Sequence, residues 1–167
     1  MRAGAALLLL AAASCGSETS RLHEPARPDF AGLAWVDGAP DLQGRVLLVR
    51  WWTENCELCS GSAPALTRLA AKVPLVAVYH PKPRREVTPA QVRQAAAKVG
   101  IHGILAIDGD GAVLDRWAPP AERQTTLLTF LLDAHGRVRY VHPGGLIGPE
   151  DEEHLVQRIE ALLAEKT

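Results

Sequence analysis

The sequence lacks a dominant charge, because 18 lysines and arginines nearly balance 19 aspartates and glutamates and leave a net charge of −1. A nucleic-acid-binding face needs concentrated positive charge, so we expect no nucleic-acid partner. Aromatic residues make up only 5% of the chain, and cysteine occurs three times. The 167 residues, 47% of them apolar, suit one globular domain whose core needs neither staples nor a partner. We therefore expect a monomer.

The sequence also lacks an apolar run of the roughly 20 residues that span a bilayer. The shorter run at residues 5–13 follows Arg2 and precedes small residues and Cys15. This order is typical of a secretory signal peptide. More specifically, it indicates a bacterial lipoprotein signal over residues 1–14, cleaved before Cys15, whose sulfur then carries lipid. Ala12 stands where such signals usually have Leu, so ordinary cleavage is the alternative. We expect an exported protein of the bacterial cell envelope or periplasm, anchored to the membrane through this lipid.

The rest of the chain divides into a short polar segment and one domain. Residues 15–29 are polar, contain prolines and show no periodicity, which predicts a flexible tether. Residues 30–167 alternate strand-like and helix-like patterns. This alternation predicts an α/β fold with a central mixed β-sheet flanked by helices on both faces. The expected strands are 33–36, 46–52, 75–79, 104–107, 126–132 and 138–141, and the expected helices are 59–72, 89–99 and 150–164.

Local signals mark the ends of some of these elements. Thr88 is a suitable N-cap, Pro89 suits a first helical position and Gly100 suits a C-cap. Residues 108–111 indicate a plain turn, because they lack the third acid and the closing Glu of a calcium loop. The apolar stripe expected to bury the last helix consists of Leu155, Ile159, Leu162 and Leu163.

Cys56 and Cys59 lie where the strand at 46–52 gives way to a helix. Two cysteines three residues apart at a helix N-terminus are close enough to bond. The first of them lies beside unsatisfied backbone N–H groups and the positive end of the helix dipole. Both effects favour the thiolate, which is the nucleophile of disulfide exchange. We predict that Cys56 attacks a substrate disulfide and that the deeper Cys59 resolves the mixed disulfide. Export places such a pair where disulfides persist.

Two other interpretations of this pair remain open. Cys-x-x-Cys is also half of many zinc sites, but no second Cys or His pair has that spacing, and the histidines are scattered. An inert structural disulfide is the other interpretation, although so short a loop constrains the unfolded chain least. We expect no metal and no cofactor other than the redox-active disulfide itself.

The stretch 46–64 (VLLVRWWTENCELCSGSAP) resembles the TlpA/ResA-like branch of the thioredoxin superfamily, which contains exported, membrane-tethered thiol–disulfide oxidoreductases. Trp52, Cys56, Cys59 and Pro64 fall on the positions of that branch's motif. The resemblance implies a thioredoxin-like fold and exchange with protein thiols and disulfides. It also implies a membrane-bound electron donor, since the chain encodes none.

A second stretch, 129–138 (TFLLDAHGRV), is similar to the family's late strand, turn and following strand. The family has a cis-proline facing the disulfide, and counting back from Asp133 places Leu127 there. A cis peptide bond before Leu costs roughly 3–4 kcal/mol, so the loop either stores that strain or takes another shape. The neighbouring family residue pairs with substrate backbone, and here it is Thr126. The resemblance thus implies substrate contacts at Thr126 and Leu127. Trp51 and Trp52 are expected as one core and one rim residue of the strand, and substrate stacking on Trp52 is the alternative.

Other positions near the motif also depart from the family. Ser62 replaces a Glu present in some members, Asn55 replaces an aromatic residue, and Arg50 replaces a buried acid or Asn. Glu57, between the cysteines, disfavours the thiolate, which favours a reductant near thioredoxin's potential of about −270 mV. Arg50 acts in the opposite direction if it points toward the thiols.

Two alternative functions would use the same dithiol. A Sco-like copper-binding chaperone is favoured slightly by the missing cis-proline, which leaves the dithiol more open to a metal. Against it, Sco proteins have a Cys-x-x-x-Cys spacing and a matching late His, and neither is evident here. A peroxiredoxin-type peroxidase normally has a Pro-x-x-x-Thr-x-x-Cys pattern, which is absent before Cys56.

Overall fold

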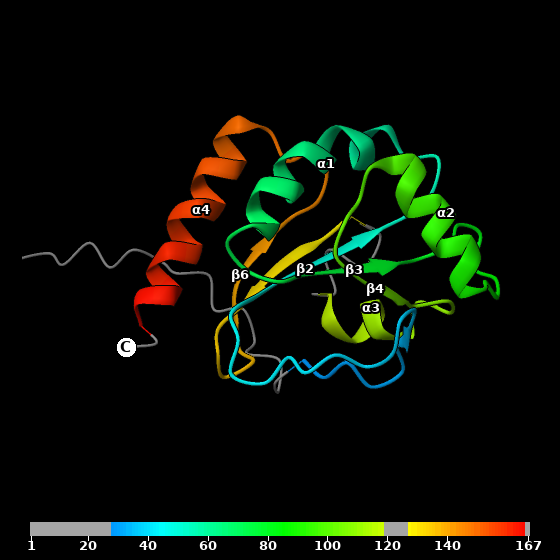
Figure 1. Ribbon diagram of the computed structural model, residues 1–167, viewed down its shortest axis with the longest axis horizontal. Helices are drawn as coiled ribbons and strands as arrows, with labels where there is room; N and C mark the ends of the chain where they lie inside the picture. Colours follow the sequence, from blue (N-terminus) through cyan, green and yellow to red (C-terminus); the bar gives the residue numbers. More distant parts are fainter. Residues whose placement is uncertain (1–27, 119–126, 166–167) are drawn as a thin grey trace, which may run out of the picture.

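The computed structural model describes residues 28–118 and 127–165, which form one mixed sheet with helices on both sides (Figure 1). The sheet has six strands in the order β1-β4-β3-β2-β5-β6. β2, β3 and β4 run parallel, and β1, β5 and β6 join through antiparallel pairings. The expected α/β fold with a mixed sheet is therefore confirmed. The strands are β1 (Ala34–Trp35), β2 (Leu47–Trp52), β3 (Leu75–Tyr79), β4 (Ile104–Ile107), β5 (Thr129–Leu132) and β6 (Val138–His142).

The helices divide unequally between the two faces of the sheet. In Figure 1, α1, α2 and α4 lie on one side and α3 lies on the other. Two separate clusters of buried side chains match this division, one beneath α1, α2 and α4 and one beneath α3. The sheet is thus the middle layer of three, as an apolar sheet with two buried faces requires. The helices are α1 (Glu57–Ala70), α2 (Pro89–Val99), α3 (Ala112–Trp117) and α4 (Pro149–Ala164).

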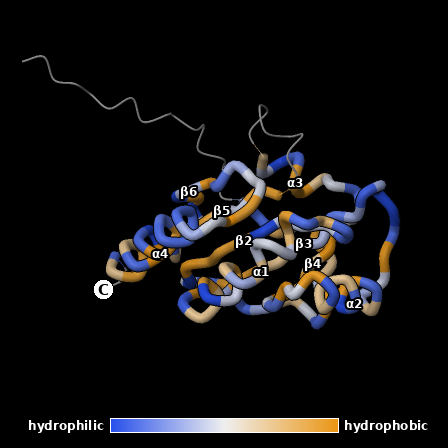
Figure 2. The backbone as a smooth tube through the Cα atoms, turned by 90° about the horizontal axis from the view of Figure 1, so that it is seen from above, coloured by the Kyte–Doolittle hydropathy of each residue, from blue (hydrophilic) through white to orange (hydrophobic). Residues whose placement is uncertain are grey.

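β2 lies inside the sheet, and all its residues are buried. Its side chains alternate between the faces, as the pleat dictates. Leu48 and Trp52 pack in the cluster under α1, α2 and α4, whereas Val49 and Trp51 pack in the cluster under α3. The hydropathy of α2 and α4 alternates between hydrophilic and hydrophobic along the chain (Figure 2), which is typical of helices with one buried stripe.

The ends of α2 follow the local signals in the sequence. Thr88 and Gln91 form a reciprocal capping box, and Pro89 opens the helix. Gly100 ends it with a left-handed backbone (φ 81°), which glycine adopts without a steric penalty. The prediction for this helix is confirmed at both ends.

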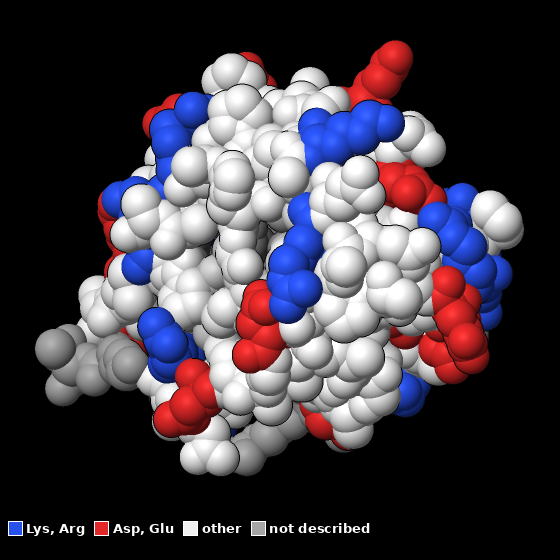
Figure 3. Space-filling model, turned by 45° about the vertical axis from the view of Figure 1, so that its right-hand side comes forward, with Lys and Arg blue, Asp and Glu red and all other residues white. Residues whose placement is uncertain are grey.

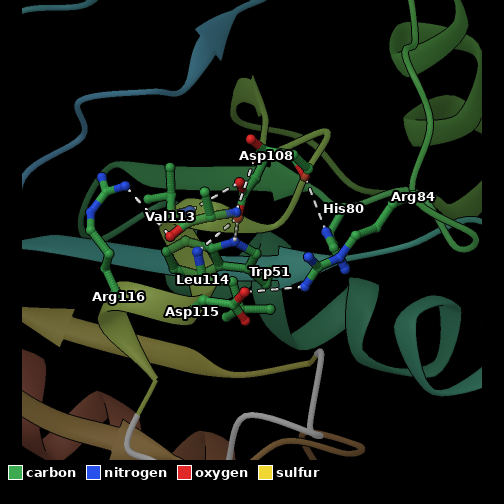
Figure 4. Close-up of polar contacts among 10 residues, drawn as sticks. Trp51, His80, Arg84, Asp108, Val113, Leu114, Asp115 and Arg116 are labelled. Carbon is green, nitrogen blue, oxygen red and sulfur yellow. Dashed lines mark hydrogen bonds and ion pairs between the residues drawn. The ribbon is translucent and has the colours of Figure 1, made fainter.

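Asp108 is the main local feature that the sequence reasoning missed. It was expected in a plain turn, but its carboxylate is buried and caps a further helix, α3 (Figure 4). It accepts hydrogen bonds from the backbone N–H groups of Val113 (3.2 Å) and Leu114 (2.8 Å). It also accepts one from Nε1 of Trp51 (3.1 Å), so one carboxylate ties α3 to the central strand.

Other expectations also differ from the structure in detail. β5 begins at Thr129 rather than at residue 126, and Thr126 lies outside the described residues. α1 begins at Glu57, two residues earlier than expected, because Cys56 itself is the N-cap. Leu163, expected in the buried stripe of α4, is 40% exposed.

Charged side chains of both signs are interspersed on the face shown in Figure 3. Two ion pairs join α1 and the turn after it to α4, namely Arg68 with Glu152 (2.6 Å) and Lys72 with Glu160 (2.8 Å). Such exposed pairs each contribute only about 0–1 kcal/mol, so the docking of α4 depends on its buried leucine and isoleucine side chains. Among the helices of the described residues, none combines the length and the apolar character needed to cross a membrane.

We predict that Asp108→Ala lowers the free energy of unfolding by about 3 kcal/mol, because it leaves buried donors of Trp51, Val113 and Leu114 without an acceptor. Urea unfolding followed by tryptophan fluorescence measures this loss. Asp110→Ala is the matched control, because Asp110 is exposed and accepts a single backbone hydrogen bond, from Ala112. The control should lose less than about 1 kcal/mol. Equal losses in the two variants would contradict the anchoring role of Asp108.

Candidate active site

The two cysteines lie at the junction of β2 and α1. After Trp52 the chain turns through Asn55, whose backbone is left-handed (φ 52°), a conformation that Asn tolerates better than most residues. Cys56 is then the N-cap of α1, and its sulfur accepts a hydrogen bond from the backbone N–H of Cys59 (3.1 Å). The turn therefore places a sulfur atom among the free N–H groups of a helix start.

Cys56 and Cys59 form a disulfide, with their Cα atoms 5.2 Å apart. Their exposures differ sharply, since Cys59 is 1% exposed while Cys56 is half-buried. A disulfide of this kind offers one sulfur to an incoming thiolate and hides the other. This difference supports attack through Cys56 and resolution by Cys59.

Charged groups surround Cys56 in balanced numbers. Glu54 pairs with Arg85, and this contact, together with a hydrogen bond from Tyr79, holds the pKa of the Glu54 carboxyl below its usual range although partial burial opposes the shift. Lys98 donates to Oδ1 of Asn55 (3.3 Å). The rim of the site therefore carries charges of both signs.

A cleft of about 560 Å³ opens beside Cys56, between the start of α1 and α2. Both polar and apolar side chains line it, so the outer sulfur faces a groove of mixed character. The residues at its wall include Glu54, Asn55, Cys56, Gln91, Gln94 and Lys98.

Leu127, at the position where the family has its cis-proline, is 9% exposed and packs in the same buried cluster as Cys59. Its carbonyl oxygen accepts a hydrogen bond from the guanidinium of Arg50. The structure thus brings Leu127 into the core that carries the disulfide. Thr126, the other expected substrate contact in this loop, lies outside the described residues, as does Cys15.

Trp52 does not lie where a substrate could stack on it. Its side chain is completely buried and contacts the ring of Tyr79 edge-on, with centroids 4.9 Å apart. No ring face is open to solvent, so in this structure Trp52 supports the site from within the core. This agrees with the core position that the sequence allowed for one of the two tryptophans, because β2 is buried along its whole length, including its last residue.

Ser62 is a site residue whose role the sequence did not reveal. It is completely buried, donates to the carbonyl of Leu58 (2.7 Å) and accepts from the backbone N–H of Ile147 (3.0 Å). A Cβ atom on Gly61 would come within 2.8 Å of Leu146. Both contacts press the loop after β6 against α1, and a helical glycine is the sequence signal for such a close approach.

Two exposed leucines lie on this part of the surface. Leu58, between the cysteines, is 46% exposed, and Leu146, on the loop after β6, is 47% exposed. Among the described residues, no group of three or more His, Cys, Asp and Glu side chains could hold a metal ion. The described part of the site therefore offers two sulfurs, a cleft of mixed lining and two exposed apolar side chains.

The chain is similar to known thiol–disulfide enzymes, although no protein-family model matches it. The thiol-disulfide oxidoreductase YkuV of Bacillus subtilis is 24% identical over 154 residues, which are 87% of this chain and 98% of YkuV. A thiol:disulfide interchange protein DsbE homolog of Paracoccus denitrificans is 29% identical over 126 residues, covering 73% of this chain and 64% of that protein. These relatives favour neither the copper chaperone nor the peroxidase.

Solved structures share the fold. A secreted disulfide oxidoreductase of Mycobacterium tuberculosis superposes with a TM-score of 0.57 at 21% identity, covering 77% of this chain and 93% of its own. The exposed lipoprotein thioredoxin Etrx1 of Streptococcus pneumoniae superposes with a TM-score of 0.59 at 19% identity. The match covers 78% of this chain and 97% of that chain. These likenesses show the thioredoxin fold, which confirms the fold expected from the resemblance.

We predict that iodoacetamide alkylates Cys56 of the reduced, folded protein at least about tenfold faster than Cys59, because only its sulfur is within reach of solvent. Mass spectrometry of tryptic peptides during a time course gives the two rates. Full unfolding in guanidinium chloride is the control and should make the rates similar. Equal rates in the folded protein would remove the distinction between an outer and an inner thiol.

Proposed function

We infer that the chain is an exported thiol–disulfide oxidoreductase of the thioredoxin superfamily that exchanges the Cys56–Cys59 disulfide with the thiols and disulfides of other proteins. One observation carries this inference, namely a disulfide at a helix start with a half-buried outer sulfur and a buried inner sulfur. The thioredoxin fold and the named relatives support it.

The exchange proceeds through a mixed disulfide. The thiolate of Cys56 attacks one sulfur of a substrate disulfide, and the other substrate sulfur leaves as a thiolate that takes up a proton. The sulfur of Cys59, after losing its proton, attacks the Cys56 sulfur and displaces the second substrate sulfur. The protein is then oxidised to the Cys56–Cys59 disulfide, and the substrate has gained two electrons and two protons.

The helix start contributes to the first step. The backbone N–H of Cys59 points at the Cys56 sulfur (3.1 Å), and a hydrogen bond to the charged form lowers a thiol pKa. Glu57, exposed between the two cysteines, acts against this. We propose that the protein works as a reductant of protein disulfides, with Cys56 as nucleophile and Cys59 as resolving thiol.

The same proposal includes the membrane. The run at residues 5–13 and the small residues before Cys15 support a lipoprotein signal, and the solved lipoprotein thioredoxin of Streptococcus pneumoniae shows that this fold occurs on a lipid anchor. A membrane-bound donor would return two electrons to the oxidised pair after each cycle, together with the proton that Cys59 takes up. The protein acts as a monomer in this scheme.

We predict that the wild-type protein catalyses reduction of insulin by dithiothreitol and that Cys56→Ser abolishes this, because the remaining Cys59 sulfur is buried and out of reach of a substrate disulfide. Cys59→Ser should accumulate a mixed disulfide with the substrate, visible on a non-reducing gel, because the resolving thiol is gone. Thr67→Ala, on an exposed position of the same helix, is the matched control and should keep the wild-type rate within about twofold. Activity in Cys56→Ser would overturn the assignment.

We predict that the full chain, expressed in a bacterium, partitions into the detergent phase of a Triton X-114 extract and carries a diacylglyceryl adduct on Cys15. Cys15→Ser should move the protein to the aqueous phase, because the acyl chains that bind the membrane are absent. Intact-mass spectrometry measures the adduct directly. A wild-type protein that stays in the aqueous phase without an adduct would exclude the lipid anchor and leave the redox assignment intact.

A further inference from the structure

Arg50 is a buried cation with unusual partners. It lies in the middle of β2 and is completely buried. Its guanidinium donates to the carbonyl of Leu127, to Oγ1 of Thr129 (2.8 Å) and to the carbonyl of Gly145 (2.8 Å). All three acceptors are neutral, and no carboxylate of the described residues forms an ion pair with Arg50.

Burying a cation without a counter-charge is costly, and proteins usually avoid it. Desolvation lowers the pKa of Arg50 to about 10, so the side chain is still protonated at neutral pH. Its Nε atom has no hydrogen-bond partner in the described part of the chain. Three neutral acceptors therefore compensate the lost hydration only in part, and the charge itself stays uncompensated in the oxidised protein.

The position of Arg50 places this charge in the layer that carries the disulfide. Its side chain leaves β2 on the same face as Leu48 and Trp52, which pack in one cluster with Cys59 and Leu127. That cluster takes its residues from the sheet and from α1, α2 and α4, the three helices that lie together on one side of the sheet in Figure 1. The cation thus shares an apolar layer with the inner sulfur.

The acceptors of Arg50 come from two segments beside α1. Leu127 precedes β5 and Gly145 follows β6, and the loop of Gly145 lies against α1 through the contact of Ile147 with Ser62 (3.0 Å). The guanidinium therefore links the segment before β5 to the loop after β6, and that loop is in turn held against the helix of the cysteines.

Reduction changes the charge of this layer. The disulfide is neutral, whereas the reduced pair carries a negative charge as soon as Cys56 is a thiolate. We propose that Arg50 is the built-in counter-charge of the reduced site, which stabilises the Cys56 thiolate and shifts the couple toward the reduced form. This role makes Arg50 a positioning residue, and it rests on the proposed exchange at Cys56 and Cys59.

The corresponding half-reaction balances with a single proton. The Cys56–Cys59 disulfide takes up two electrons and one proton and becomes the thiolate of Cys56 and the thiol of Cys59. A dithiol donor supplies the electrons, is oxidised to its own disulfide and releases two protons, of which one goes to Cys59 and the other to solvent. The positive charge of Arg50 is unchanged throughout, so it favours the side of the reaction that carries the negative charge.

Four other charged groups lie near Cys56, namely Glu54, Glu57, Arg85 and Lys98. They stand at the rim of the site, where solvent and salt weaken their effect. Because two are acidic and two are basic, their contributions largely cancel. Arg50 differs from all four in being completely buried, so its interaction with the thiolate is screened least.

The test compares three variants of the full chain. Arg50→Gln is neutral but keeps amide donors for the carbonyls of Leu127 and Gly145, Arg50→Lys keeps the charge, and Thr129→Val keeps the charge but removes one acceptor. Equilibration with reduced and oxidised glutathione gives the equilibrium constant for reduction, and the pH profile of Cys56 alkylation gives the apparent pKa of its thiol.

We expect Arg50→Gln to lower the equilibrium constant for reduction by about tenfold, equivalent to a potential about 30 mV more negative, and to raise the apparent pKa of Cys56. Arg50→Lys and Thr129→Val should stay within about threefold of wild type on both measures. If Arg50 had a purely structural role, Thr129→Val and Arg50→Gln would change the equilibrium constant for reduction and the apparent pKa of Cys56 by similar amounts. That result would overturn the proposal. Unchanged values in a folded Arg50→Gln would overturn it as well.

Two measurements on the wild-type protein keep the proposal testable if Arg50→Gln does not fold. A counter-charge requires the apparent pKa of Cys56 to lie below the ordinary value of about 8.5 for a free thiol, so a wild-type midpoint at or above that value would overturn the proposal. A wild-type disulfide that never equilibrates with glutathione would instead overturn the proposed exchange itself. The two failures are therefore distinguishable.

Discussion

The site depends on one constraint, which is that the last residue of a buried central strand and the N-cap of a helix are only four residues apart. Both faces of β2 are buried, and β2 lies between two other strands, β3 and β5. Its end is therefore held in place. The left-handed turn at Asn55 then leaves Cys56 as the N-cap of α1. A cysteine in that position has its sulfur among free N–H groups, and the partner one turn later is pointed into the core.

The two faces of β2 differ in the residues that they bury. On the face toward α3, Trp51 packs edge-on against Trp117 and Phe130, with ring centroids 5.0 and 5.5 Å apart. Its Nε1 also donates a hydrogen bond to Asp108, so this layer is structural. The face toward α1 contains the exception to apolar packing, Arg50. A buried charge lowers stability unless something compensates it, and the only change of charge in that layer during the proposed cycle occurs at the cysteines.

The sequence predicted those features whose cause lies within a few residues. The apolar run at 46–52 predicted β2, the signals around Thr88 and Gly100 predicted both ends of α2, and the spacing of Cys56 and Cys59 predicted the disulfide. Features that depend on partners far along the chain could not be predicted in this way. Arg50 meets its acceptors 77 and 95 residues later, so its sequence context showed a substitution in the family pattern but not the direction of its side chain.

Asp108 shows the same limit at shorter range. Asp108 lies only a few residues before Val113 and Leu114. These two residues and Trp117 are apolar, and this pattern was the sequence signal of a helix that faces the core. What the spacing could not reveal is that the carboxylate faces inward and meets Trp51 on another strand (Figure 4). Burial decides whether such an acid ends a turn or caps a helix, and burial is a property of the assembled sheet.

The balance of charges also bears on which disulfides the protein can reduce. Glu57 is exposed, so water and salt weaken its effect on the thiolate, whereas Arg50 and the N-terminus of α1 act from inside the fold. If Arg50 has the proposed role, the buried groups that favour the thiolate outweigh the exposed acids that oppose it, and the couple is a milder reductant than the residues between the cysteines suggest. Structural disulfides of secreted proteins, with potentials below about −300 mV, resist such a reductant, whereas strained or exposed disulfides have higher potentials and accept its electrons. Under the proposed exchange, labile disulfides of other proteins are thus the substrates expected for this site.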